Sequence, residues 1–174
     1  MQEVSDERSH FDGAPMTTLV EAKAELRAAL LAGGIVDCPC CTQVCKIYKR
    51  KLNKPMARLL LWLVHQPEKD PRWYNVHEFP LIQGRRGGGD FAKLVHWGLV
   101  EECPKDSEDK TRRTSGLWRP TKKGIAFARG EVEVLSHVHL YNNVAYDVGH
   151  AQWIGIRDAL GNKFDYEELM GEGI

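Results

Sequence analysis

The segment MARLLLWLVHQ, which starts at Met56, constrains the fold of this chain more than any other part of the sequence. Apolar side chains would lie on nearly every side of the helix that this segment forms. A helix with one apolar stripe lies on a protein surface, whereas a helix that is apolar almost all round must be covered on all sides. The segment therefore predicts a helix buried inside a domain, and 174 residues suffice for one domain with appended segments.

The residues after this helix predict a strand and a second helix. Residues 73–79, WYNVHEF, have the aromatic and β-branched composition of a short strand. Asp90 is a favourable N-cap for a helix whose apolar face includes Leu94 and Val95. Gly98 follows the last apolar position, so we expect the helix to end there.

A hairpin and a third helix are expected next. LVEEC, from Leu99, and GLWRPT, from Gly116, have the composition of paired strands, and the polar run PKDSEDKTRRTS between them is a long hairpin tip. TKKGIAFARG then predicts a helix with Thr121 as its N-cap.

Residues 93–128, KLVHWGLVEECPKDSEDKTRRTSGLWRPTKKGIAFA, resemble the recognition helix, wing and following helix of winged-helix regulators of the MarR type. In those proteins a leucine and a GL[VI]E sequence end the recognition helix, and LT..G begins the next one. Leu94, residues 98–101, Thr121 and Gly124 occupy these places here. The resemblance implies an α+β fold with a winged helix-turn-helix core, DNA binding and a role in transcription regulation.

The chain also resembles a family of small phage and prophage proteins of unassigned function. This similarity lies in the CPxC, KIYKRKLN, WGLVEE, SGLWRPTKKG and FDYEELM segments and extends over most of the chain. It implies that the protein is phage-encoded, and it implies no activity.

Composition changes along the chain predict four parts. Residues 1–16 are expected to be a mobile tail, because they are polar and show no periodicity. Residues 17–54 are expected to hold an N-terminal helix and a Cys-rich, basic segment, and residues 55–130 the winged helix-turn-helix. Residues 131–174 are expected to be an acidic hairpin with short helices.

The flanking parts contain recognisable signals for helix ends and turns. Thr18 and Glu21 form a capping box, and Gly33 ends that helix. The basic stretch from Lys46 is interpreted as a short helix that ends at the break from Asn53 to Pro55. EVEVL and HVHLYNNVAYDV are expected as strands, the second folded at Asn142-Asn143. IRDALG and FDYEELM are expected as two short acidic helices.

Charge is distributed unevenly, although the formal net charge is zero. Residues 1–33 have a net charge of minus three and residues 131–174 of minus six, whereas residues 34–130 carry nineteen basic and ten acidic side chains. A basic middle between acidic ends is typical of a polyanion-binding module with solubilising flanks, although chance segregation of charge produces the same pattern.

Within the basic middle, the wing is expected to supply most contacts to double-stranded DNA. Arg112 and Arg113 at its tip suit phosphates or a narrow minor groove. The recognition helix would expose Lys93, His96 and Trp97, so base-specific readout is weakly supported. The Lys46 to Lys54 stretch contains Tyr48, a mixture seen where phosphates are bound and a base stacks, and a solvated helix face explains it equally well. The expected DNA-binding residues are Lys49, Arg50, Arg85, Arg86, Lys93, His96, Arg112, Arg113, Arg119, Lys122 and Lys123.

The cysteines offer a candidate metal site. Four of the five lie between Cys38 and Cys45, an arrangement that favours reduced thiols or a metal over a secreted disulfide framework. Cys38 and Cys41 have the spacing of two zinc ligands, and Cys45 is the nearest third candidate. The cofactor zinc remains an alternative to a reduced-thiol turn. His137 and His139 would lie on one side of a strand, which permits metal binding, although surface polar residues show the same spacing.

No arrangement of catalytic residues is evident, so we expect a cytoplasmic binding protein and not an enzyme. The longest apolar run is far shorter than a bilayer span requires, and no secretory signal is recognisable. The main hypothesis is a phage-encoded winged-helix protein that binds DNA, with a homodimer left open. The alternative is a protein-interaction module that modulates a host protein through its acidic C-terminal region.

Overall fold

The computed structural model describes residues 18–66, 73–79, 88–104, 115–149, 152–161 and 166. Helices and strands both occur in it, so the chain is α+β, as the sequence predicts. The chain divides into two compact units, Met1–Ile47 and Tyr48–Ile174, and each is described by itself. Within the described ranges, no helix has the length and apolar character needed to cross a bilayer.

The first unit consists of one helix and one small hairpin. Helix α1, Leu19–Leu31, begins with the predicted capping box, in which the Glu21 N–H donates to Thr18 Oγ1 and the Thr18 N–H donates to Glu21 Oε2. The chain leaves the helix through Gly33, whose φ of 85° favours glycine. Strands β1, Val36–Asp37, and β2, Val44–Cys45, pair antiparallel after it.

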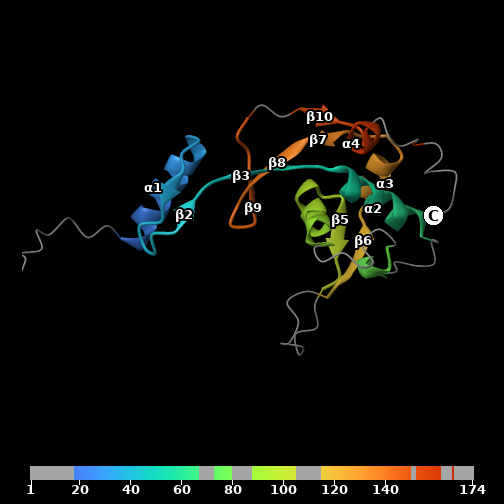
Figure 1. The fold of residues 1–174 in the computed structure, drawn as a ribbon, viewed down its shortest axis with the longest axis horizontal. Helices are drawn as coiled ribbons and strands as arrows, with labels where there is room; N and C mark the ends of the chain where they lie inside the picture. The colour runs from blue at the N-terminus through green and yellow to red at the C-terminus, as the bar shows by residue number, and fades with distance from the viewer. Residues whose placement is uncertain are drawn as a thin grey trace, which may run out of the picture. The chain divides into compact units, whose positions relative to one another are not determined.

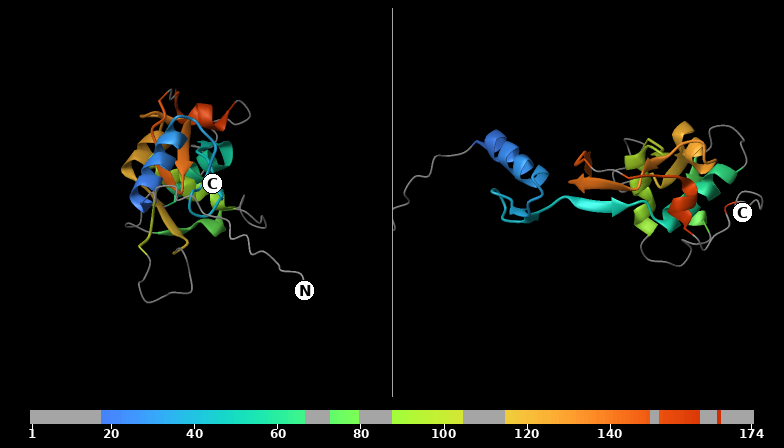
Figure 2. Two further views of the ribbon diagram at one scale, coloured as in Figure 1. Left: turned by 90° about the vertical axis from the view of Figure 1, so that its left-hand side faces the viewer. Right: turned by 90° about the horizontal axis from the view of Figure 1, so that it is seen from above.

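A three-stranded antiparallel sheet begins the second unit. It has the order β3-β8-β9, with β3 at Tyr48–Lys51, β8 at His137–Tyr141 and β9 at Val144–Tyr146 (Figure 2). The predicted turn at Asn142-Asn143 is confirmed, because both residues have positive φ, 48° and 59°. The prediction of a short helix over the basic stretch is wrong. Pairing with β8, a partner far along the chain, holds these residues extended.

Helix α2, Lys54–His65, is the buried helix that its composition predicts. Its N-cap is Asn53, whose Oδ1 accepts the Met56 N–H at 3.1 Å, and Pro55 lies in the first turn, where its missing N–H costs nothing. Helix α2 contacts α4 (Ile156–Leu160), α3 (Lys122–Ala128), η2 (Gly88–Trp97) and β6 (Leu117–Pro120), and so occupies the centre of the unit (Figure 1). Its buried side chains are Met56, Ala57, Leu59, Leu60, Leu61, Trp62 and Leu63.

A second antiparallel sheet packs beside α2. Its order is β4-β6-β5, with β4 at Tyr74–Asn75 and β5 at Val100–Glu102. The strand predicted over residues 73–79 is shorter than expected, because a 3-10 turn, η1 at Val76–Glu78, follows β4. The Asn75 side chain favours this turn by accepting the His77 N–H at 3.1 Å.

The helix before β5 differs from its prediction in its type and at its start. It is the 3-10 helix η2, and Asp90 lies inside it instead of capping it, because the helical turn already begins at Gly88. Trp97 was expected to be exposed but is buried, and its indole N–H donates to the Leu135 carbonyl oxygen at 2.5 Å. Val95, expected on the apolar face, is 43% exposed. The predicted end at Gly98 is confirmed by its φ of 69°.

The remaining elements close the second unit. Helix α3 has the predicted N-cap, since Thr121 Oγ1 accepts the Gly124 N–H at 3.0 Å. Strands β7, Val134–Leu135, and β10, Trp153–Ile154, pair antiparallel, and α4 follows where IRDALG predicts a helix. Of the FDYEELM segment only Tyr166 is described, and its hydroxyl donates to the Ala128 carbonyl oxygen. The helix predicted over FDYEELM therefore lies outside the described residues.

Candidate nucleic-acid interface

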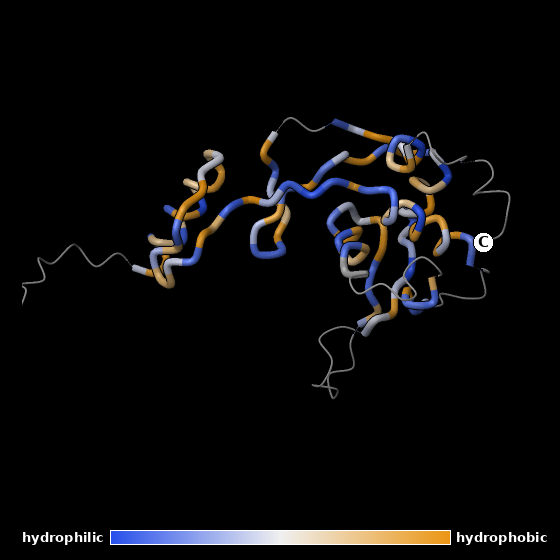
Figure 3. Tube along the Cα trace, viewed as in Figure 1, coloured by the Kyte–Doolittle hydropathy of each residue, from blue (hydrophilic) through white to orange (hydrophobic). Residues whose placement is uncertain are grey.

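Strand β3 is a fully exposed, basic edge strand. All four of its residues, Tyr48, Lys49, Arg50 and Lys51, are exposed, and the strand is drawn hydrophilic along most of its length in Figure 3. An exposed strand edge with lysines is protected against pairing with other chains, so a solvated edge is one function of these charges. What these charged side chains can bind depends on which residues of β8 lie opposite them.

The register of β3 against β8 places two lysines opposite two histidines. Lys49 pairs with His139 and Lys51 pairs with His137. Residues directly opposite each other in an antiparallel pair point to the same face of the sheet. These four side chains, two lysines and two histidines, therefore form one row, which we call the Lys-His row. The alternate residues of β8, Val138 and Leu140, are buried on the other face and anchor the sheet to the core.

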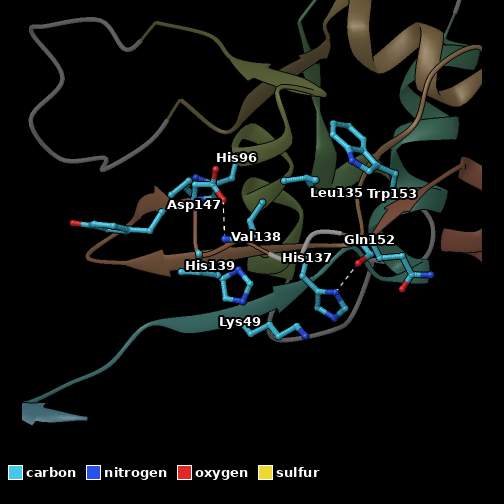
Figure 4. Close-up of a pocket in the computed structure, with 14 residues that line it drawn as sticks. Lys49, His96, Leu135, His137, Val138, His139, Asp147, Gln152 and Trp153 are labelled. Atoms are coloured by element: carbon cyan, nitrogen blue, oxygen red, sulfur yellow. Dashed lines mark hydrogen bonds between the residues drawn. The ribbon is translucent and has the colours of Figure 1, made fainter. Parts of the chain in front are cut away.

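A pocket of about 530 Å³ adjoins this row. In Figure 4, His137, His139 and Lys49 lie on one side of β8, whereas His96 and Val138 lie on the other. The pocket therefore follows both sides of the β8–β9 hairpin. Its lining residues are Lys49, His96, Leu135, Ser136, His137, Val138, His139, Ala145, Tyr146, Asp147, Val148, Gly149, Gln152 and Trp153.

His96 links η2 to the turn of this hairpin. Its Nε2 lies 3.2 Å from Asn143 Oδ1, a contact between residues 47 positions apart. The sequence-predicted residues His96 and Lys49, which come from distant segments, thus line one pocket.

The two histidines of the row are poised to stay neutral near pH 7. Partial burial lowers the pKa of His137, and the nearby charges of Lys49, Lys51 and His139 lower it further. Partial burial and the charge of Lys49 lower the pKa of His139 in the same way. The Ser136 hydroxyl oxygen lies 2.8 Å from His137 Nδ1 and fixes the ring. A bound anion would offset the lysine charges and raise both pKa values, because an opposite charge favours the protonated imidazole.

The predicted cations of the winged-helix region are largely engaged within the molecule. Arg119 Nε donates to Glu101 Oε1 at 2.6 Å, and its guanidinium stacks on Trp73. Lys123 Nζ donates to the Trp97 carbonyl oxygen at 2.9 Å, and Lys93 pairs with Asp90. Lys122 is exposed.

The other predicted DNA-binding residues fall into two groups. Lys49 and Arg50 lie on β3, where the Arg50 guanidinium sits over the Tyr48 ring at 5.3 Å from its centroid. Arg85, Arg86, Arg112 and Arg113 lie outside the described residues. Lys51 was not among the predicted site residues, although it belongs to the Lys-His row. The alternation of HVHLY opposite YKRK was the signal that could have found it.

The predicted metal ligands separate into exposed and buried thiols. Cys38 and Cys41 lie in the β1–β2 turn, where Cys41 is exposed, while Cys45 is buried in β2 and its thiol donates to the Gln43 carbonyl oxygen. Hydrogen bonds from the backbone N–H groups of Cys40 and Cys41, and from the thiols of the same residues, lower the pKa of Cys38. In the described part of the chain, no three His, Cys, Asp or Glu side chains converge on one metal position.

Comparison with known proteins does not assign the chain. No protein-family model matches it, and no curated protein or solved structure is detectably similar. Function must therefore be argued from the geometry of the chain itself.

Proposed function

We propose that residues 55–130 form a winged helix-turn-helix and that the protein binds double-stranded DNA, chiefly through its phosphates, in a regulatory role. Within the described residues, the Lys-His row is the main part of this binding surface. A phage-encoded regulator with modest sequence preference fits this proposal best.

The order of elements supports the fold. Helix α2 is followed by β4, the short turn η1, helix η2 and then the β5–β6 pair. Strand β6 lies between β5 and β4, so the strand that returns from the long hairpin pairs with the strand that precedes the helices. This arrangement is the one that the MarR-type resemblance implies, with η2 as the recognition helix and β5 and β6 as the strands of the wing.

The single observation that carries DNA binding is the register that lines up Lys49 and Lys51 with His139 and His137. Lysines bind phosphates as point charges and release the counterions that surround DNA, which supplies most of non-specific affinity. A neutral imidazole N–H can donate to a phosphate oxygen, and it becomes a cation when the phosphate raises its pKa. The row therefore suits a run of phosphates better than a single carboxylate.

The internal contacts of the other cations support backbone binding with modest specificity. Lys93 of η2 pairs with Asp90, and Arg119 of β6 pairs with Glu101. A base contact by either side chain would have to break an existing ion pair. Phosphate contacts position a protein on DNA without reading sequence, so a surface dominated by them predicts weak discrimination among sequences.

The proposal is tested by duplex binding of the full chain and of Lys49→Ala/Lys51→Ala, measured by fluorescence anisotropy. Two exposed ion pairs worth up to about 1 kcal/mol each predict a loss of affinity of about fivefold to thirtyfold.

The matched control is Lys23→Ala/Arg27→Ala, which removes the same charge from α1 in the other unit. Equal losses in the two double variants would reduce the effect to net charge and contradict a site on the Lys-His row. Absence of DNA binding by the unmodified chain would overturn the proposal and favour the protein-interaction module with its acidic segment 131–174.

A further inference from the structure

The described part of the first unit has a very small core. Its described part, residues 18–47, buries only Ala22, Leu30 and Cys45 among its hydrophobic side chains. Five large apolar residues of the same part are exposed: Leu19, Val20, Leu31, Ile35 and Val44. The unit ends at Ile47, close to the length of about 40 residues below which a disulfide, a metal or a second subunit is usually needed for stability. No disulfide joins its cysteines, which leaves a metal or a second subunit.

Backbone hydrogen bonds close the β1–β2 turn around its first cysteine, Cys38. The Cys38 N–H donates to the Gln43 carbonyl oxygen at 2.8 Å, and the Thr42 N–H donates to the Cys38 carbonyl oxygen at 2.9 Å. These bonds close the turn, and Thr42 takes a positive φ of 58° to do so. The N–H groups of Cys40 and Cys41 point at the Cys38 sulfur. Such N–H groups orient a thiolate and neutralise part of its charge when it binds a metal.

Of the three cysteines in the turn, Cys38 and Cys41 have the spacing of two ligands of one metal, and Cys40 does not; a structural zinc prefers four ligands. Cys38 and Cys41 carry the i, i+3 spacing of a zinc knuckle, and structural zinc is bound by four tetrahedral ligands at about 2.3 Å from each sulfur. Cys45 is not available as a third ligand, because its buried thiol is turned to the Gln43 carbonyl. Within the described residues no third His, Cys, Asp or Glu completes a group with this pair.

We propose that the Cys38 and Cys41 thiolates of two copies of this chain bind one zinc ion between them. Each of the four thiols releases its proton to solvent as it binds, and no oxidation or reduction takes place. A two-fold axis through the zinc supplies the missing pair of ligands from the same turn of the second copy. Ile35, 71% exposed, and Val44, 63% exposed, flank the turn and become covered in this dimer. The dimer therefore supplies the two missing zinc ligands and covers exposed apolar side chains of the first unit.

The test measures zinc content and molecular mass of the full chain, purified in the presence of zinc. The expected result is one zinc per two chains and a particle of twice the 19.7 kDa chain mass in light scattering. Addition of a chelator is expected to remove the zinc and to return the mass to that of one chain. Cobalt in place of zinc is expected to show the absorption of a tetrahedral four-thiolate site.

Serine variants distinguish the two proposed zinc ligands from the neighbouring cysteine, Cys40. Cys38→Ser and Cys41→Ser are each expected to abolish zinc binding and dimer formation, whereas Cys40→Ser keeps both, because its backbone N–H is retained. Far-UV circular dichroism of each variant checks that the chain still folds. One zinc per single chain, a dimer that survives both zinc removal and Cys38→Ser, or no zinc at all would each overturn the proposal. These readouts do not involve DNA, so they are independent of the proposed function.

Discussion

At the scale of single residues, alternation along β8 gives its side chains two separate roles. Val138 and Leu140 are buried, whereas His137 and His139 face the lysines of β3. The row concentrates cationic groups without any carboxylate directly opposite them, and Asp147, which also lines the pocket, is the nearest acidic residue among the lining side chains. Proton uptake by the row should therefore respond both to folding and to bound phosphate.

The depressed histidine pKa values predict a stability that falls on acidification. Below the usual histidine pKa of 6.5, the unfolded chain takes up protons that the folded chain resists. The contribution of the two histidines is fully present above pH 6.5 and is lost as the pH falls toward their lower folded values. Urea unfolding at several pH values between about 7.5 and 5.5 measures this loss.

The histidine contribution is isolated by His137→Gln/His139→Gln. The free energy of unfolding of this variant should depend less on pH in that range than that of the unmodified chain. Identical pH dependence in the two proteins would show that the histidines titrate alike in the folded and unfolded states.

At the scale of elements, α3 lies very close to the start of β5. A Cβ atom added at Gly124 would lie 1.9 Å from the Leu99 carbonyl oxygen and 2.9 Å from its carbon. The Thr121 hydroxyl also donates to the Gly98 carbonyl oxygen at 2.6 Å. The N-terminus of α3 is therefore locked to the chain segment that ends η2 and begins β5.

Gly124→Ala should consequently destabilise the protein, although alanine favours helix in isolation. Backbone lies on both sides of the contact, so the strain is expected to exceed the gain of about 1 kcal/mol in helix propensity and to leave a net loss of about 1–3 kcal/mol. Chemical denaturation measures it. Gly155→Ala is the control, since its nearest neighbour would be Asp158 Oδ2 at 3.7 Å, and a loss below about 1 kcal/mol is expected there. A stabilised Gly124→Ala variant would contradict the close approach.

Most features set by neighbouring residues were predictable from the sequence, although Asp90, expected as an N-cap, lies inside η2. The caps at Thr18 and Thr121 and the turn at Asn142-Asn143 depend on side chains within three positions of each other, and all are present. The burial of α2 followed from its composition alone.

Features set by distant partners were not predictable in this way. Strand β3 was interpreted as a helix because nothing in its own residues indicates β8 as a partner. Trp97 was expected to be exposed because its position in the helix pattern does not show the Leu135 carbonyl that its indole contacts. The Lys-His row also depends on distant partners. Lys49, His137 and His139 were singled out from the sequence, but the register that aligns them was not predicted.

At the scale of the whole molecule, the two proposals describe separate tasks for the two units. The first unit would join two chains through zinc, and the second would bind DNA phosphates. A dimer carries two DNA-binding surfaces, so the second contact forms at a high effective concentration after the first. Chelation is then expected to weaken DNA binding without altering the surface that binds it.

The central claim, that the Lys-His row binds DNA phosphates, is tested most directly by the salt dependence of binding. The logarithm of the affinity falls linearly with the logarithm of salt concentration, by about 0.9 for each phosphate contact. Binding isotherms of the unmodified chain and of Lys49→Ala/Lys51→Ala are measured over the same salt series. We predict that the slope of the variant is shallower by about 1.8, which corresponds to two lost contacts. Equal slopes in the two proteins would show that neither lysine contacts a phosphate and would contradict the account.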